Sequence, residues 1–144
     1  MEAGGKSQRH EGTKAQRAPI PPELERIATL VVHAAYLVHK RLGPGLLESI
    51  YEVCLVHELQ KRGRRVERQV PLPVVYDGIR FQEAFRLDIL VEGCFVVEVK
   101  AVEQLLPVHR AQVLTYLRFL GQRLGLLINF DMELIKDGIH RVVL

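Results

Sequence analysis

The chain has 144 residues, of which 48% are hydrophobic and 26% are charged, a balance that suits one folded domain with a substantial core. Its net charge of +3 is weak support for a polyanionic partner, because residues 1–21 alone hold four basic and two acidic side chains. The two cysteines, Cys54 and Cys94, are too few for a disulfide framework or a cysteine-rich zinc cluster, and no apolar run reaches membrane-spanning length. Without an apolar segment near the N-terminus, a cytoplasmic location is expected.

The first segment along the chain is predicted to be a disordered tail, residues 1–21, because it is rich in Gly, Lys, Arg and Gln and ends in prolines. Residues 22–144 are predicted to form one domain. From Pro22 to about Leu42, apolar residues recur at intervals of three and four, which predicts a helix with Pro22 in its first turn. Gly43-Pro44-Gly45 then ends this helix.

A second helix is predicted from about Leu46 to Arg62, with Gly63 as its C-cap. Its expected apolar face consists of Leu47, Ile50, Tyr51, Cys54, Leu55 and Leu59. A basic cluster follows at the end of this helix and in the next segment: Lys61, Arg62, Arg64, Arg65 and Arg68. A run this short is more often a solvated helix end and loop than a nucleic-acid site, so we expect the former.

After Gly63 the hydrophobic period changes to two, which predicts strands at residues 66–75, 79–91 and 94–100 in an antiparallel meander. Pro71 and Pro73 indicate an edge strand or a bulge in the first of them. Residues 108–120 are predicted to be helical, 124–130 to form a strand buried on both faces, and 139–144 to form a last strand. The expected fold class is therefore α/β, with a mixed central sheet flanked by helices.

Three charged residues stand out in the predicted hairpin. Asp88 interrupts an apolar strand, and Glu98 and Lys100, two residues apart on the next strand, face the same side. Because an unpaired buried charge is costly, a carboxylate at such a position needs a partner. A hairpin that turns at Glu92-Gly93 places Asp88 opposite residue 97 or 98, and the second register would bring two carboxylates and an ammonium group together.

Such a trio has two interpretations. Two carboxylates, with the backbone carbonyl of Val99, could hold Mg²⁺ or Mn²⁺, which keeps several of its waters. Lys100 could then orient the attacking water or offset charge on a scissile phosphate. Alternatively, Glu98 and Lys100 form a structural ion pair at a strand edge. The spacing alone leaves both interpretations open.

Four short motifs occur in an order that is known from one group of proteins. Residues 45–51 read GLLESIY, Asp88 is followed by Glu98-Val99-Lys100, and residues 112–116 read QVLTY. The first motif matches the GxxExxY proteins, the acid and the Glu-x-Lys match the PD-(D/E)XK nuclease superfamily, and the last fits a Q-x-x-x-Y element of related nucleases. The chain thus resembles the GxxExxY family within that superfamily from about Glu25 to Leu144, although Leu87 stands where the superfamily has proline.

This resemblance implies a restriction-endonuclease-like core and a Mg²⁺-dependent nuclease that hydrolyses phosphodiester bonds, with Mn²⁺ as the other candidate metal. It implies metal ligation by Asp88, Glu98 and the Val99 backbone, a catalytic role for Lys100, a contact of Glu48 with the metal through water, and contacts of Gln112 and Tyr116 with substrate. Tyr51 shares a helix face with Glu48 and either contacts substrate or packs in the core.

The nearly neutral charge of the domain also fits a second hypothesis, since a nuclease usually has a basic groove. In that hypothesis the protein is a non-catalytic nucleic-acid-binding or assembly module that retains the nuclease fold. In both hypotheses the expected partner is nucleic acid, with DNA favoured over RNA, and not a membrane. A domain of this size has little surface on which to bind a nucleic acid. A homodimer would enlarge that surface.

Overall fold

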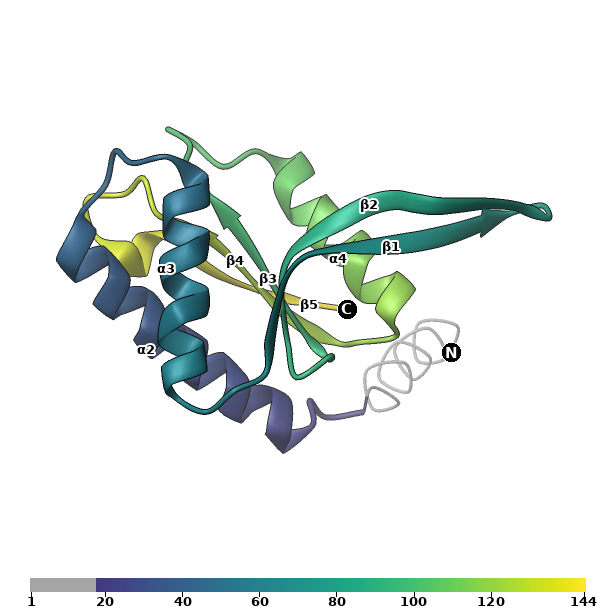
Figure 1. The fold of residues 1–144 in the computed structure, drawn as a ribbon, viewed down its shortest axis with the longest axis horizontal. Coiled ribbons are helices and arrows are strands. Elements are labelled where there is room, and N and C mark those ends of the chain that lie inside the picture. The colour runs from purple at the N-terminus through teal and green to yellow at the C-terminus, as the bar shows by residue number, and fades with distance from the viewer. Residues whose placement is uncertain (1–17) are drawn as a thin grey trace, which may run out of the picture.

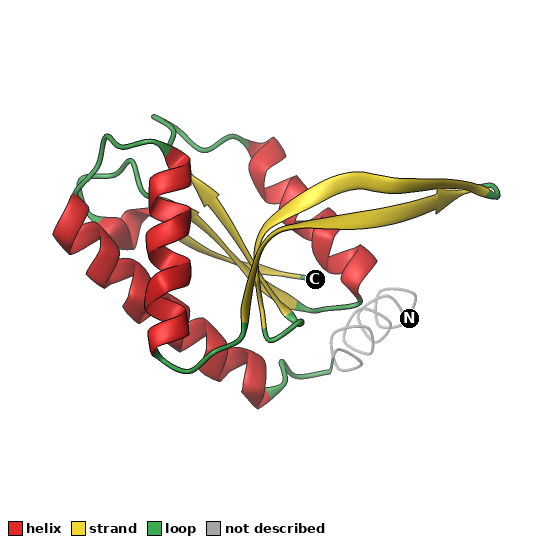
Figure 2. Ribbon diagram, viewed as in Figure 1, coloured by secondary structure: helices red, strands yellow, loops and turns green. Residues whose placement is uncertain are grey.

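The computed structural model describes residues 18–144, which form three α-helices, five strands and one short 3₁₀ helix (Figures 1 and 2). In chain order these are α2 (Pro22–Leu42), α3 (Glu48–Lys61), β1 (Val66–Tyr76), β2 (Ile79–Val91), β3 (Phe95–Lys100), α4 (Pro107–Leu120), β4 (Leu124–Asn129), η1 (Ile135–Gly138) and β5 (Ile139–Val143). Every predicted helix and strand is present, and only η1 was not predicted.

The five strands form one sheet in the order β1-β2-β3-β4-β5. The meander β1-β2-β3 is antiparallel, as its turns predicted, whereas β3 and β4 are parallel because α4 crosses over between them. β5 returns antiparallel beside β4. The sheet is therefore mixed, and the α/β fold class expected from the sequence is confirmed.

Helices cover both faces of this sheet (Figure 1). On one face, α2 and α3 pack through residues such as Ile27 and Leu55 against Val97 of β3. On the other face, Leu117 of α4 packs against Val96 of the same strand. Because β3 and β4 are covered on both sides, their apolar runs are continuous, and any charged side chain on β3 has to be accommodated inside the protein.

The hairpin of β1 and β2 is much longer than the other strands and runs out past α4 (Figure 2). Its outer part is exposed, whereas β2 from Leu87 onward enters the core. β1 is an edge strand with a register shift between Leu72 and Val74, as the two prolines predicted. β2 pairs with β3 only from Ile89 to Val91, so the two strands diverge at Asp88.

Two expectations from the sequence need comment. Residues 18–20, which were assigned to the tail, contact the body: Arg123 donates to the carbonyls of Ala18 and Pro19, and Ile20 packs against the core. The rest of the predicted tail, residues 1–17, lies outside the described residues. On the second helix, the prediction was wrong for Leu47 and Ile50, which are 74% and 43% exposed.

Among residues 18–144, no helix combines the length and the hydropathy that a transmembrane segment requires.

Candidate metal centre

The fork between β2 and β3 is where the predicted acidic residues meet. The last ladder pairs are Ile89–Val97, Leu90–Val96 and Val91–Phe95, and the same register continued by one residue sets Asp88 opposite Glu98. The backbone N–H of Val99 does not pair with a backbone carbonyl of β2. It donates to the carboxylate of Asp88, at 2.9 Å from Oδ2. The diverging strands thus hold this carboxylate between them.

Glu98 is almost completely enclosed, with 5% of its side chain exposed. Its Oε2 lies 3.3 Å from Nζ of Lys100, whose side chain is 15% exposed. Its other oxygen, Oε1, is buried and accepts no hydrogen bond from any described residue. A buried carboxylate oxygen without a donor is unusual in proteins and indicates a place for a further positive group.

The electrostatics of Glu98 show that the three charged side chains form one cluster. Burial raises the pKa of Glu98, and the neighbouring Asp88 carboxylate raises it further, to about 8, against the opposing effect of Lys100. The Glu98 carboxyl therefore takes up a proton far more readily than an exposed glutamate does. Asp88, Glu98 and Lys100 are close enough to influence one another and are not splayed onto separate faces.

The donor set at the fork fits a hard divalent cation. Mg²⁺ takes oxygen ligands, commonly one or two carboxylates with several waters. In an extended strand the N–H and C=O of one residue point to the same edge, so the Val99 carbonyl faces the side on which its N–H meets Asp88. Within the described chain no three His, Cys, Asp or Glu side chains gather as a metal cluster, so a site here rests on two carboxylates and a backbone oxygen. A cation there would satisfy the orphaned Oε1 of Glu98.

Gln112 and Tyr116 approach this cluster from α4. Tyr116 is buried, and its pKa is raised to about 12 by burial and then by Glu98 and Asp88. Oε1 of Gln112 is buried without a hydrogen-bond donor among the described residues. Both residues line a cavity of about 310 Å³ together with Phe85 of β2, whose ring stacks on Tyr116 at 4.8 Å. Tyr116 therefore lies near enough to the acidic pair to feel its charge, and Gln112 lines the same cavity one turn earlier on the helix.

Tyr51 and Glu48 lie at the beginning of α3 and differ in surroundings. Tyr51 is fully buried; its hydroxyl donates to the Gly43 carbonyl at 2.6 Å and accepts from the Leu46 N–H at 3.0 Å. Its ring stacks on Phe130, so core packing accounts for this residue and no surface is left for a substrate contact. Glu48 is exposed in the first turn of α3, and its contact with a metal through water stays a prediction.

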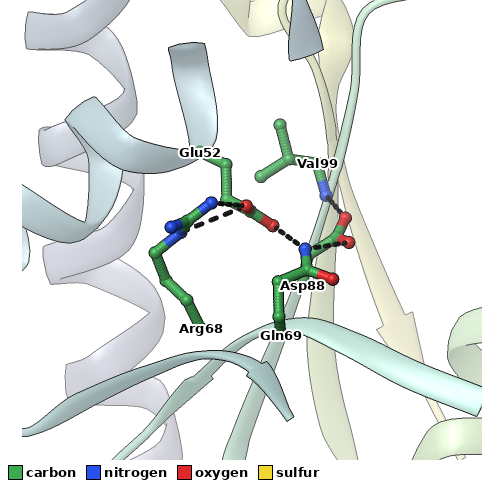
Figure 3. A network of polar contacts seen from close by, with 5 residues as sticks. All are labelled: Glu52, Arg68, Gln69, Asp88 and Val99. Atoms are coloured by element: carbon green, nitrogen blue, oxygen red, sulfur yellow. Dashed lines mark hydrogen bonds and ion pairs between the residues drawn. The ribbon is translucent and has the colours of Figure 1, made fainter. Parts of the chain in front are cut away.

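On the side of α3, Asp88 adjoins a polar network of Glu52 and Gln69, which the sequence analysis did not select, and Arg68, which it assigned to the basic cluster (Figure 3). Glu52 is buried and accepts from Nη2 of Arg68 at 2.5 Å and from Nε2 of Gln69 at 2.8 Å. Glu52 lies four residues after Glu48, on the same helix face, between apolar residues. A buried acidic residue between apolar residues requires a hydrogen-bond donor nearby. This requirement was the signal in the sequence that could have identified Glu52.

The basic cluster is mostly neutralised within the protein. Arg62 pairs with Glu58, Arg64 with Glu23, and Arg68 with Glu52. These ion pairs agree with the structural interpretation of the cluster, in which its side chains belong to a helix end and a loop.

The described residues thus combine a mixed sheet flanked by helices with an acid on one strand and Glu-x-Lys at its fork with the next, the arrangement of a nuclease-like α/β domain. A sequence model of the PD-(D/E)XK nuclease superfamily matches residues 25–142, and the chain belongs to this superfamily. A search among curated proteins and another among solved structures each found no match. The resemblance stated from the motifs is confirmed for the superfamily, whereas membership of the GxxExxY family stays a prediction.

Proposed function

We propose that the protein is a Mg²⁺- or Mn²⁺-dependent nuclease that hydrolyses phosphodiester bonds in nucleic acid, with DNA preferred to RNA. Membership of the superfamily supports the nuclease class. The observation that carries the proposal is the convergence of Asp88, Glu98 and Lys100 at the β2–β3 fork, with one oxygen of Glu98 left without a donor. Two free cysteines fit the reducing cytoplasm in which we place it.

In this proposal Asp88, Glu98 and the carbonyl of Val99 hold the cation, and Glu48 reaches it through a water molecule. When bound, such a cation lowers the pKa of an attacking water and offsets the charge that develops on the phosphate. The Val99 N–H fixes the Asp88 carboxylate in advance, so that little ordering is needed when the cation binds.

Lys100 is the catalytic residue in the proposal. Its ammonium group lies at the partly open side of the cluster, where it can meet a scissile phosphate as a point charge and orient the attacking water. Gln112 and Tyr116 contact the nucleic-acid backbone from the neighbouring cavity. Because its pKa is about 12, the Tyr116 hydroxyl keeps its proton at neutral pH and can donate a hydrogen bond to a phosphate oxygen.

The direct test is a cleavage assay on single-stranded DNA, duplex DNA, RNA and branched DNA, with Mg²⁺, Mn²⁺ or EDTA. Wild-type protein should cleave at least one of them only with metal, and Lys100→Met should not cleave. Lys136→Met, at an exposed lysine of η1, is the matched control and should cleave like wild type. Failure of the wild type to cleave any of the four substrates would contradict the proposal.

The second candidate is a non-catalytic nucleic-acid-binding or assembly module, which the internal pairing of the basic cluster favours. In that case nucleic acid should bind in a salt-dependent manner, the binding should survive Lys100→Met, and no cleavage should occur. A homodimer would extend the surface for substrate in either case, and sedimentation of the protein with and without DNA measures it.

A further inference from the structure

Gln69 has an unusual backbone conformation beside the acidic cluster. It lies in β1 between the ladder pairs Arg68–Ile89 and Val70–Leu87, opposite Asp88, but is not itself paired. Its φ of 52° falls in the left-handed region, which is strained for a residue other than glycine. Such strain is retained only where surrounding contacts impose it, and here the contacts are made by the side chain.

The amide of Gln69 is anchored from α3. Its Nε2 donates to Oε1 of Glu52 at 2.8 Å. The other oxygen of Glu52, Oε2, accepts hydrogen bonds from both Nε and Nη2 of Arg68, at 3.1 and 2.5 Å. Glu52 is 4% exposed and fixed on both sides, so it fixes the amide of Gln69 in turn (Figure 3).

The same amide nitrogen faces Asp88. It lies 3.5 Å from Oδ1 of Asp88, while Oδ2 is held by the Val99 N–H. A carboxamide has two N–H donors, one for each of the facing carboxylates. Without it, Glu52 and Asp88 would face each other with no donor between them, and the Asp88 carboxylate would lose one of the two contacts that hold it.

We propose that Gln69 is the positioning residue of Asp88: from β1, and fixed by the Glu52–Arg68 pair, it holds the Asp88 carboxylate in the orientation in which it ligates the metal. This inference rests on the proposed metal site. Groups that hold a metal ligand in place typically contribute a factor of about 10 to 100 to metal affinity.

A purely structural role of Gln69 can be distinguished from a positioning role by a substitution that removes the side chain and preserves the backbone conformation. Glycine adopts a φ of 52° without strain, so Gln69→Gly removes the side chain without requiring a new backbone conformation. Asp77→Gly is the matched control, because Asp77 has a φ of 47° and lies exposed in the turn at the far end of the same hairpin.

The experiment is a titration of the full chain with Mn²⁺, in which free Mn²⁺ is measured by electron paramagnetic resonance. Gln69→Gly should bind Mn²⁺ about 10- to 100-fold more weakly than wild type. Asp77→Gly should bind like wild type, and thermal unfolding should be similar in all three proteins. Cleavage by Gln69→Gly should recover as the Mn²⁺ concentration is raised.

Equal Mn²⁺ affinity in Gln69→Gly and wild type would overturn the positioning role and leave the proposed metal site intact. No Mn²⁺ binding by wild type would overturn both. If Gln69→Gly does not fold, Gln69→Asn decides, because it keeps an amide and suits the left-handed region but is too short to reach Glu52 and Asp88 together. Wild-type affinity in that variant would also overturn the inference.

Discussion

Asp88→Ala should reduce the rate of metal-dependent cleavage by at least about a hundredfold, because in the proposed site this carboxylate would hold a cation that supplies several kcal/mol of transition-state stabilisation. The loss follows from the geometry of the fork. Asp88 is the only acid that β2 contributes there, and the Val99 N–H holds it toward β3. The measurement is single-turnover cleavage of the best substrate at fixed Mg²⁺.

The control for this substitution is Asp137→Ala, which removes an exposed carboxylate from η1. It should leave the cleavage rate unchanged. Circular dichroism should show that both variants are folded. A folded Asp88→Ala protein that cleaves at the wild-type rate would remove this residue from the site.

Glu98→Gln should abolish cleavage and yet stabilise the metal-free protein at alkaline pH. In the folded protein the pKa of Glu98 is raised to about 8, mainly by burial and then by Asp88, from an ordinary value of 4.5. Between pH 4.5 and 8 the folded state therefore binds more protons than the unfolded state. The contribution of Glu98 to the free energy of unfolding is fully present below about pH 4.5 and is lost as the pH rises through 8. A glutamine side chain carries no charge at any pH, so the variant does not lose stability in this way as the pH rises.

We expect the melting temperature of Glu98→Gln in EDTA to exceed that of wild type at pH 9 by on the order of 5 °C. The difference should shrink toward pH 5, where the wild-type carboxyl is protonated. Glu103→Gln, at an exposed residue after β3, should melt like wild type at both pH values. A lower melting temperature for Glu98→Gln than for wild type at pH 9 would show that the carboxylate is stabilised in the absence of metal.

Burying the charged side chain of Glu98 costs free energy, and for this reason Glu98 could be recognised as a candidate site residue from the sequence. On a strand covered by helices on both faces, every residue from Phe95 to Val99 is buried, and Glu98 alone among them is charged. The alternation of β3 and the turn at Glu92-Gly93 were sufficient to predict that Glu98 and Lys100 share a face. The turn left two registers open, with Asp88 opposite residue 97 or 98, and the ladder pairs of β2 and β3 select the second.

The surroundings of the site could not be predicted in the same way, because they depend on contacts between distant segments. Arg68 meets Glu52 sixteen residues away in the sequence, and Arg64 meets Glu23 across forty-one. Nothing in the local sequence marks Gln69 as a residue with positive φ, since the residues that favour this conformation are glycine, asparagine and aspartate. Its conformation results from the tertiary contacts of its side chain.

The inward face of α3 was predicted correctly at Tyr51, Leu55 and Leu59, but two other residues were misplaced for the same reason. Helical periodicity placed Leu47 and Ile50 inside with Leu55, but the structure buries Glu52 and Glu58 instead. Arginines of the following segment neutralise both glutamates, so these acidic residues are accommodated where periodicity alone favours leucine.

The central claim, that a divalent cation binds between Asp88 and Glu98, is tested most directly by calorimetric titration with Mn²⁺ at pH 7 in two buffers of different ionisation enthalpy. Because burial and Asp88 raise the pKa of Glu98, ligation of a cation by its carboxylate should release protons, and the apparent binding enthalpy should depend on the buffer. We expect binding of Mn²⁺ with proton release in wild type and neither in Asp88→Ala. Unchanged binding in Asp88→Ala, or binding in wild type without proton release, would contradict the account.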